Sequence, residues 1–560
     1  MLCVKQPTKA RGKRLALGAL AAVLALAMLT GCNGSGDSDS GSSNPGSSSG
    51  TSTLTRYKEP ITLTWQTSTS DDYPLDSEGL KEVMDKVAEA TNVTVEWVPV
   101  PASDANQIYT TTLLSGKSQW PNLITKDLGT INQDGVLGAF VDLTPYLEEK
   151  MPNVYERLNS YDRWGDMVNL NSAQIFGVPR VGQQICSQSW MIRKDWLDIC
   201  GLEEPTTVEE FADALRAFKE KNPGNAPEGY NYPFTARGNP QQWMSTVFGS
   251  WGMNSIYYTE FEDGTIELNL RMDEFRECMQ YWHQLYEEGL IDPEVVIGDA
   301  NRWTMYMNNS YSGATIDYTV RTQQFTNAAQ NPAEDAIAAG VEPNPDAELI
   351  GLAPLTSGSR TTATIACNDP LGTGTAVGIM SSSTDEEIEA AMCLLNYIYS
   401  DEGSELLSWG IDGVSYNGLD SDGNPNWVDD LLNNYSIPTT SKYGIQLGIA
   451  RPVTQPEIDL AFPGLAKEAA LKNEGHFETR HSTMYLTDAE WTEHGDIFTQ
   501  LSNLYIQACS EFLTGARTLD DAGWDQFQAD LDALNVDRYM ELNELGIKNA
   551  QDMLADFTLG

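Results

Sequence analysis

The stretch ITLTWQTSTSDDYPLDSEGLKEVMDKVAEATNVTVEWVP, residues 61–99, decides the fold class of this chain. Apolar and polar side chains alternate over residues 61–65 and again over 93–97, which predicts two strands. Between them, apolar side chains recur every three or four positions over residues 80–87, which predicts a helix. A strand, a helix and a second strand in this order predict a parallel pair with a helical crossover, the unit of an α/β lobe.

Residues typical of helix starts occur further along the chain. Thr207 with Glu210, and Thr384 with Glu387, form capping boxes ahead of apolar positions at helical spacing. From about Arg56 the composition is globular to the end, and roughly 500 residues exceed what one hydrophobic core supports. The sequence therefore predicts an α/β protein of at least two lobes.

The first segment of the chain predicts export. Five basic residues and no acid precede an apolar run from Leu15 to Leu29, as in a signal peptide. The run ends in Leu29-Thr30-Gly31-Cys32, which resembles a bacterial lipobox. We expect residues 1–31 to be cleaved and Cys32 to carry the lipid. Residues 32–55 are rich in Gly and Ser and are expected to form a flexible, disordered linker.

Charge limits the range of partners. The chain has 34 Lys and Arg against 80 Asp and Glu, and loss of the five basic residues of the first segment leaves a net charge of −51. Such a surface repels nucleic acid and anionic lipid. It also argues against a strongly anionic ligand, although a local cationic pocket could override the global field.

Enzyme motifs are incomplete. Ser115-Gly116-Lys117-Ser118 ends like a phosphate-binding loop, but Thr111 stands where the first glycine belongs. Gly372-Thr373-Gly374 places Val377 where a dinucleotide site needs its third glycine. The four histidines form no H-E-x-x-H pair, and the sequence offers no credible G-x-S-x-G elbow. We predict no catalytic residues and no cofactor, while a converging pair of carboxylates for glycoside hydrolysis stays open.

Two further segments were candidates for metal binding, and the cysteines are candidates for disulfide bonds. Residues 222–228 read NPGNAPE, which lacks the carboxylates that a calcium site needs, and Asp420-Ser421-Asp422-Gly423-Asn424 favours a hairpin turn over a metal loop. We therefore predict no metal. The six cysteines after Cys32 include no C-x-x-C pair and allow up to three disulfides, but several fall on apolar helical faces, which favours a buried apolar role.

Several short stretches, in chain order, carry a family resemblance. They are Leu114–Gly116 with Pro121–Ile124, Phe140–Leu147, Ile192–Leu197, Tyr286–Pro293, and Tyr399–Gly403 with Trp409–Tyr416. Together they make the chain resemble bacterial extracellular solute-binding protein family 1. The resemblance is to its branch of large ABC-transporter substrate-binding lipoproteins, which includes LplA-like and alginate- or oligosaccharide-binding members.

The resemblance implies a periplasmic-binding-protein-like α/β fold of type II, in which two hinge-connected lobes enclose a central ligand cleft. By this analogy, lobe 1 comprises residues 56–178 and 354–383, and lobe 2 comprises residues 179–353 and 384–560. It also implies a monomer held at the extracellular face of the cell membrane by its lipid alone. The protein would capture a carbohydrate, as an oligosaccharide, and deliver it to the transmembrane subunits of an ABC permease, with no nucleic acid involved.

Ligand-binding candidates come from loops that correspond to cleft-lining regions in similar proteins, where sugars need aromatic platforms and planar hydrogen-bonding groups. They are Asp71, Asp72, Asp127, Gln184, Arg237, Trp243, Trp251, Asp317, Tyr318, Trp409, Asp412 and Tyr416. Thr67 and Lys126 lie in the same loops. Each candidate has an alternative role, since an aromatic residue is commonly core and a lone carboxylate a helix cap. Asp412 and Tyr416 could instead stabilise a turn.

Three functions remain open from the sequence. The first is importer-coupled capture of a carbohydrate, with no bond made or broken. The second is capture of a peptide or another solute on the same scaffold, because fold does not settle the ligand. The third is a surface glycoside hydrolase, which needs two carboxylates facing one cleft.

Overall fold

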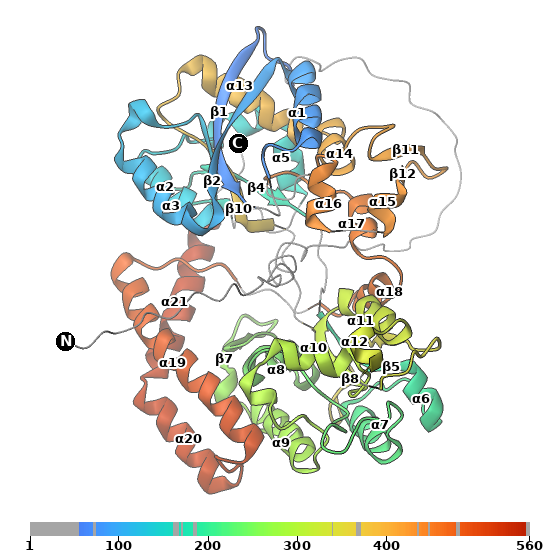
Figure 1. Ribbon diagram of the computed structural model, residues 1–560. Coiled ribbons are helices and arrows are strands. Elements are labelled where there is room, and N and C mark those ends of the chain that lie inside the picture. The colour runs from blue at the N-terminus through green and yellow to red at the C-terminus, as the bar shows by residue number, and fades with distance from the viewer. Residues whose placement is uncertain are drawn as a thin grey trace, which may run out of the picture.

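The computed structural model describes residues 55–70, 74–160, 167–169, 172–182, 188–338, 340–365, 371–433, 436–445, 449–477 and 482–555. These residues form two bodies, one above the other in Figure 1. We call the upper body, built around a five-stranded sheet, the first lobe. The lower body, built around a three-stranded sheet, is the second lobe.

The sheet of the first lobe has the order β2-β1-β3-β10-β4. Its strands are β1 (Ile61–Thr69), β2 (Val93–Pro101), β3 (Leu123–Lys126), β4 (Gly177–Val181) and β10 (Leu371–Ile379). β1 is parallel to both β2 and β3, with Ile61 opposite Val93, and β10 is antiparallel to its two neighbours. The predicted opening of two parallel strands and a crossover helix is confirmed.

The crossover helix α1 (Glu78–Thr91) shows how sequence sets one element. Ser77 caps its start by accepting a hydrogen bond from the backbone N–H of Leu80. The helix ends at Asn92, whose φ of 62° is left-handed. Its apolar face is buried in the core of the first lobe, which also holds β1 and β3. This packing, more than helix propensity, fixes the crossover against the sheet.

Further helices complete the first lobe. They are α2 (Ala105–Leu114), α3 (Leu128–Val136), α4 (Leu147–Lys150), α5 (Pro152–Asn159), α13 (Asp385–Ile398), α14 (Asp401–Trp409), α15 (Asp429–Asn433) and α16 (Ile437–Lys442). A hairpin of β11 (Tyr416–Leu419) and β12 (Pro425–Trp427) lies on its flank. The turn predicted at Asp420–Asn424 is confirmed, since Asp420 accepts backbone hydrogen bonds from Asp422 and Asn424.

The boundaries expected near residues 354 and 383 differ from the structure. Residues 354–383 are expected in lobe 1, but Leu355 is buried in the core of the second lobe. Residues 384–450 were assigned to the second lobe, but α13 and α14 bury Leu394, Leu395 and Leu407 in the core of the first lobe. α13 contacts α1, α5 and β1 directly. The apolar face of α13 was visible in the sequence, but nothing in the sequence told which sheet it would cover.

The second lobe surrounds the antiparallel sheet β8-β5-β9, formed by β5 (Gln188–Arg193), β8 (Ala314–Tyr318) and β9 (Leu349–Gly351). Its helices include α6 (Lys194–Cys200), α7 (Val208–Lys221), α8 (Pro240–Ser245), α9 (Asp273–Glu287), α10 (Ala300–Asn308), α11 (Val320–Gln330) and α12 (Glu334–Ala338), and a small hairpin pairs β6 (Tyr258–Glu260) with β7 (Ile266–Leu268). Both predicted capping boxes, at Thr207 and Thr384, are present.

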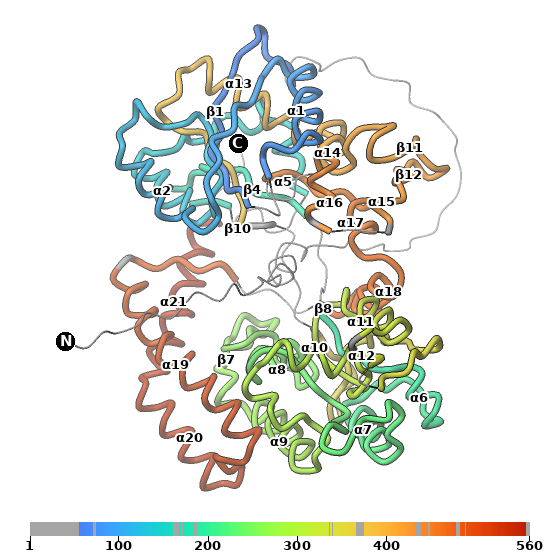
Figure 2. Tube along the Cα trace, in the orientation of Figure 1, coloured from blue at the N-terminus to red at the C-terminus, as the bar shows by residue number. Residues whose placement is uncertain are grey.

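Three long helices at the end of the chain flank the second lobe, α19 (Asp488–Thr514), α20 (Asp521–Ala533) and α21 (Val536–Leu554), drawn red in Figure 2. α21 begins in the core of the second lobe, where Val536 and Tyr539 are buried. Near its end Leu554 packs against the core of the first lobe. None of the helices in the described part of the chain combines the length and apolarity that crossing a bilayer requires.

Two connections between the lobes run side by side. Val181, at the end of β4, exchanges backbone hydrogen bonds with Arg451 and Val453, ahead of α17 (Gln455–Ala461) and α18 (Leu465–Lys472). Arg451 is fully buried and forms a two-pronged ion pair with Glu457, with N–O distances of 2.7 and 2.8 Å. A buried charge pair therefore fixes the chain where it passes from one lobe to the other.

Candidate functional site

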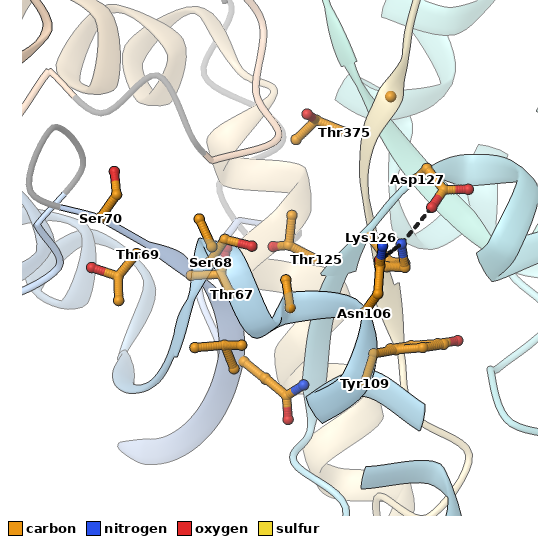
Figure 3. A pocket seen from close by; sticks show the side chains of 15 residues that line it. Thr67, Ser68, Thr69, Ser70, Asn106, Tyr109, Thr125, Lys126, Asp127 and Thr375 are labelled. Carbon is orange, nitrogen blue, oxygen red and sulfur yellow. Dashed lines mark hydrogen bonds and ion pairs between the residues drawn. The ribbon is translucent and has the colours of Figure 1, made fainter. Parts of the chain in front are cut away.

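A cavity of about 390 Å³ opens at the carboxyl ends of β1, β2 and β3 (Figure 3). The carboxyl edge of parallel strands is where α/β proteins collect ligand-binding side chains. The end of β1 and the residue after it contribute a row of hydroxyl groups, at Thr67, Ser68, Thr69 and Ser70. Thr125 and Thr375 add two more from β3 and β10. The lining is therefore rich in small hydrogen-bonding groups.

Lys126 is the cation of this first cavity. Its Nζ donates to Asp127 at 2.7 Å and to Asn106 of α2 at 2.9 Å. The same ammonium lies 5.7 Å from the ring centre of Tyr109, one turn further along α2. Figure 3 shows Lys126 between these side chains, so α2 and β3 together fix its position.

Asp127 is both a lining residue and the cap of α3. Its carboxylate accepts from the backbone N–H of Thr130 at 2.8 Å, which satisfies one open donor of that helix. Burial by itself raises the pKa of Asp127, but hydrogen bonds from Lys126 and Thr130 outweigh it and lower the pKa. Asp127 is therefore an ionised acceptor at neutral pH.

A second cavity, of about 380 Å³, lies in the second lobe. Its lining comes from the end of β8, the start of β5, the segment before α8, and the start of α10. Figure 1 places α10 and β8 on the side of this lobe that faces the first lobe, and α2 and α3 on the opposing side of the first lobe. Each lobe thus carries a polar cavity built by elements on its facing side.

Arg237 and Asp317 form the polar centre of the second cavity. Asp317 is 5% exposed, and it accepts from Nε and Nη2 of Arg237 at 2.5 and 3.2 Å. The backbone N–H of Tyr318 also donates to Asp317, at 2.7 Å. The guanidinium of Arg237 lies 5.4 Å from the ring centre of Tyr318. These three predicted residues are brought together as one cluster.

Two predicted tryptophans belong to the core. Trp251 is 1% exposed and lines neither cavity, because its ring packs against Tyr281 inside the second lobe. The expectation that Trp251 is a ligand platform is therefore wrong. Trp243 lines the second cavity but is only 3% exposed, since its ring packs against Trp282 with the two ring planes 81° apart.

Trp409, Asp412 and Tyr416 form a separate group in the first lobe. The Trp409 ring contacts Tyr416, and its Nε1 donates to Thr454 at 2.9 Å. Asp412 accepts the backbone N–H of Gly418, which stabilises the turn before the hairpin. None of the three lines either cavity, so the alternative role of turn and packing residues fits them. Asp71, Asp72, Gln184 and the proposed lipidation site Cys32 lie outside the described residues.

Several lining residues were not predicted. Asn106 and Tyr109 stand on the helix that follows β2, and the rule that selected the loops after β1 and β3 would have selected this one too. Arg321 of α11 does not line the second cavity, but it lies four residues after Asp317, and its Nε is 3.5 Å from the Asp317 carboxylate. That i, i+4 spacing was the available signal, but it is also the common spacing of solvated ion pairs.

Two α/β lobes with facing polar cavities define the class of two-lobed ligand-capture proteins. Comparison with known proteins gives the family. A family model described as bacterial extracellular solute-binding protein matches residues 82–413, more than half of the chain. The chain belongs to this family, and the resemblance inferred from the sequence is confirmed. The family is defined by binding solutes, so the comparisons also support a protein that is not an enzyme.

Individual relatives are distant. Lipoprotein LipO of Bacillus subtilis is 24% identical over 58% of this chain and 61% of LipO. The fructooligosaccharide ABC transporter substrate-binding protein FusA of Streptococcus pneumoniae is 24% identical over 44% of this chain and 48% of FusA. The aligned part thus spans about half to three fifths of these relatives.

Solved structures agree with the fold over a longer range. An HMO-binding, ABC-transporter-associated solute-binding protein from Bifidobacterium longum infantis superposes with a TM-score of 0.66 at 17% identity. The superposition covers 88% of this chain and 99% of that protein. The predicted two-lobed, periplasmic-binding-protein-like α/β fold is therefore confirmed.

Proposed function

We propose that this chain is the extracellular capture component of an ABC importer for carbohydrates, with an oligosaccharide as its ligand. The observation that carries the proposal is the pair of polar cavities, one on each lobe, in a member of the solute-binding family. The names of two relatives support the ligand class, one being a fructooligosaccharide-binding protein and the other an HMO-binding protein. We further propose a monomer that passes its ligand to the permease subunits.

The composition of the first cavity suits a sugar. Hydroxyl and amide groups of Thr67, Thr125 and Asn106 can donate to and accept from sugar hydroxyls, while Lys126 adds a fixed cation. Tyr109 lies beside them, but it is 6% exposed and Lys126 lies over its ring, so it serves to position Lys126. Closure of the lobes about their connections brings both cavities onto one ligand, and the closed shape is what a permease recognises.

An extended ligand fits the surroundings of the first cavity. A further cavity of about 500 Å³ shares Gln66 and Val100 with it and continues between β2 and α2. Trp120 lines this extension. Adjoining cavities of this kind accommodate several sugar units in a row, which supports an oligosaccharide over a monosaccharide.

A glycoside hydrolase is disfavoured by the carboxylates at hand. Hydrolysis needs a general acid whose pKa is raised and a second carboxylate facing it. Among the described residues, each cavity is lined by a single carboxylate, Asp127 or Asp317. The pKa of Asp127 is lowered, and Asp317 is held by Arg237. Both are arranged as hydrogen-bond acceptors.

Binding is tested by thermal unfolding of the purified chain against a panel of mono- and oligosaccharides and short peptides. A ligand at 100 times its dissociation constant adds about 2.7 kcal/mol to the native state, enough to raise the unfolding midpoint visibly. The proposal expects a shift with at least one oligosaccharide that is recovered chemically unchanged. Cleavage of the glycan would establish the hydrolase instead, and a shift only with peptides would establish another ligand class.

We also propose that Cys32 is lipidated and holds the protein at the outer face of the cell membrane. Support comes from the basic start, the apolar run and the lipobox-like ending of the first segment. Cell fractionation of the wild type and a Cys32→Ser variant tests this. The wild type should sediment with membranes and the variant should not be lipidated, whereas equal membrane association of an unlipidated variant would contradict the proposal.

A further inference from the structure

The helices α9 and α19 pack side by side in the second lobe with a constant offset between their contacting residues. The ring centre of Phe275 lies 6.5 Å from that of Tyr505. Further along both helices, Nδ1 of His283 donates to the carbonyl oxygen of Leu513 at 3.0 Å. The partners in each contact are 230 positions apart in the chain, so the two helices run in the same direction.

This offset places two cysteines opposite each other. Cys278 comes three positions after Phe275 on α9. Cys509 comes four positions after Tyr505 on α19, and either spacing keeps a side chain on the same face of its helix. Both cysteines are fully buried in the core of the second lobe. Burial raises the pKa of each thiol, and the electrostatic effect of Cys509 adds to the rise at Cys278, as expected of neighbouring thiols.

Other roles for this pair of thiols have less support. Within the part of the chain that the structure describes, no group of three or more His, Cys, Asp or Glu side chains could hold a metal ion, so a structural metal lacks ligands here. A reactive thiol needs a lowered pKa and access to solvent, and these two thiols have neither. Two thiols buried side by side are instead arranged for a bond to each other.

We propose that Cys278 and Cys509, drawn as thiols in the structure, form a disulfide bond that joins α9 to α19. This inference goes beyond ligand capture, since it concerns a covalent bond within the fold. The chain belongs to an extracellular family, and disulfides form and persist outside the cell. The three terminal helices reach from the core of the second lobe to that of the first, so the bond ties this segment to the body of the second lobe.

The bond forms by thiol–disulfide exchange with an oxidant outside the cell, either a small disulfide or the disulfide form of an oxidoreductase. One thiolate of the chain attacks a sulfur of the oxidant, which forms a mixed disulfide and releases one oxidant thiolate. The second thiolate of the chain attacks the mixed disulfide, which closes the bond and releases the other oxidant thiolate. The two cysteines lose two protons and two electrons, and the oxidant is reduced to two thiols. Because burial raises the pKa of both thiols, the exchange takes place before the core of the second lobe closes around them.

Peptide mapping tests the bond directly. The full chain, exported by a bacterial host, is alkylated in denaturant without a reductant and then digested with trypsin. The tryptic peptides 277–302 and 481–517 contain a single cysteine each, Cys278 and Cys509. Mass spectrometry should detect them as one linked species that is two hydrogens lighter than the two free peptides together. Reduction should separate the species into its two peptides.

Thermal unfolding measures what the bond contributes to stability. The chain is refolded either with oxidised glutathione or with a reductant, and the two preparations are compared. The bond should raise the unfolding midpoint of the second lobe by about 4 to 8 °C. A double variant, Cys278→Ala with Cys509→Ala, should remove this rise. Cys200→Ala is the matched control, because Cys200 lies on α6 of the same lobe, and it should leave the rise unchanged.

Three outcomes would overturn the inference. If both peptides are found alkylated at their cysteines before reduction, the two thiols serve only as small apolar core residues. If either peptide is linked to a different cysteine, the packing of α9 against α19 does not bring this pair together. If the rise in the midpoint persists in the double variant, another pair of cysteines causes it and this bond does not hold the helices.

Discussion

Glu457→Gln is the substitution that most directly tests how the connection between the lobes is held. Arg451 is fully buried, and its Nη1 donates to Glu457 at 2.8 Å, to Ser408 at 2.7 Å and to the carbonyl of Pro452 at 2.9 Å. Its Nη2 donates to the other carboxylate oxygen at 2.7 Å. Glutamine removes the counter-charge and turns an amide NH₂ toward a guanidinium that is itself only a donor.

The expected cost is large. Removing one partner of a buried ion pair leaves an uncompensated buried charge and costs about 3 to 5 kcal/mol. Urea unfolding, followed by tryptophan fluorescence, should show a loss of this size in the free energy of unfolding. Trp409, whose Nε1 donates to Thr454 beside the pair, lies close enough to report on this region.

The control stands on the same helix, α17. Asp459 forms an ion pair with Lys467 at 2.9 Å, but both side chains are well exposed. Surface pairs contribute about 0 to 1 kcal/mol, so Asp459→Asn should change little. A double variant, Arg451→Met with Glu457→Met, should recover part of the loss because no charge remains buried. If Glu457→Gln costs no more than Asp459→Asn, the reasoning about a buried charge at this connection is refuted.

Three further perturbations have defined outcomes. Thr384→Ala removes the capping box of α13 and should cost about 1 kcal/mol of unfolding free energy, whereas Thr384→Ser should cost much less. Gly313→Ala should destabilise by about 1 to 3 kcal/mol, because its Cβ would lie 2.3 Å from the Trp196 ring, while Gly495→Ala in α19 meets no atom and should stabilise by about 0.5 to 1 kcal/mol. Chemical denaturation of the two variants checks these predictions: the free energy of unfolding should fall for Gly313→Ala and rise for Gly495→Ala. Changes of the same sign would contradict the reasoning. Burial lowers the pKa of His494 below its ordinary value of about 6.5, although the nearby Asn543 side chain acts to raise it. Its contribution to stability is thus complete above pH 6.5 and is lost as the pH falls through the folded-state pKa. His494→Gln should flatten the stability curve below pH 6.5, and an unchanged curve would exclude this residue as a source of the pH dependence.

The sequence predicted local elements well, because their causes are local. Alternation at residues 61–65 and 93–97, and the capping residues Thr207 and Thr384, depend only on neighbours a few positions away. The first parallel pair follows, since a short helical crossover leaves few other arrangements. The family resemblance then supplied the two-lobed architecture that composition alone left open.

The candidate site was predicted less completely. Arg237, Asp317 and Tyr318 gather at one cavity, and Lys126 and Asp127 at the other, but Trp251 is buried among aromatic side chains. From the sequence alone, a tryptophan near a loop that faces a ligand cannot be distinguished from one that packs in the hydrophobic core. Only the packing of α9 around it distinguishes the two, because burial depends on residues distant in the chain.

The sequence by itself determined the α/β class, the acidic character of the chain, its family resemblance, and the start of many of its elements. The tertiary structure decided which lobe residues 384–450 join, which polar side chains meet at each cavity, and that two arginines share one carboxylate. The physical reason is the sequence separation over which each kind of interaction acts. Periodicity and capping act over a few residues, whereas lobe membership and cavity charge arise from contacts between segments far apart, such as Arg237 with Asp317 eighty residues later.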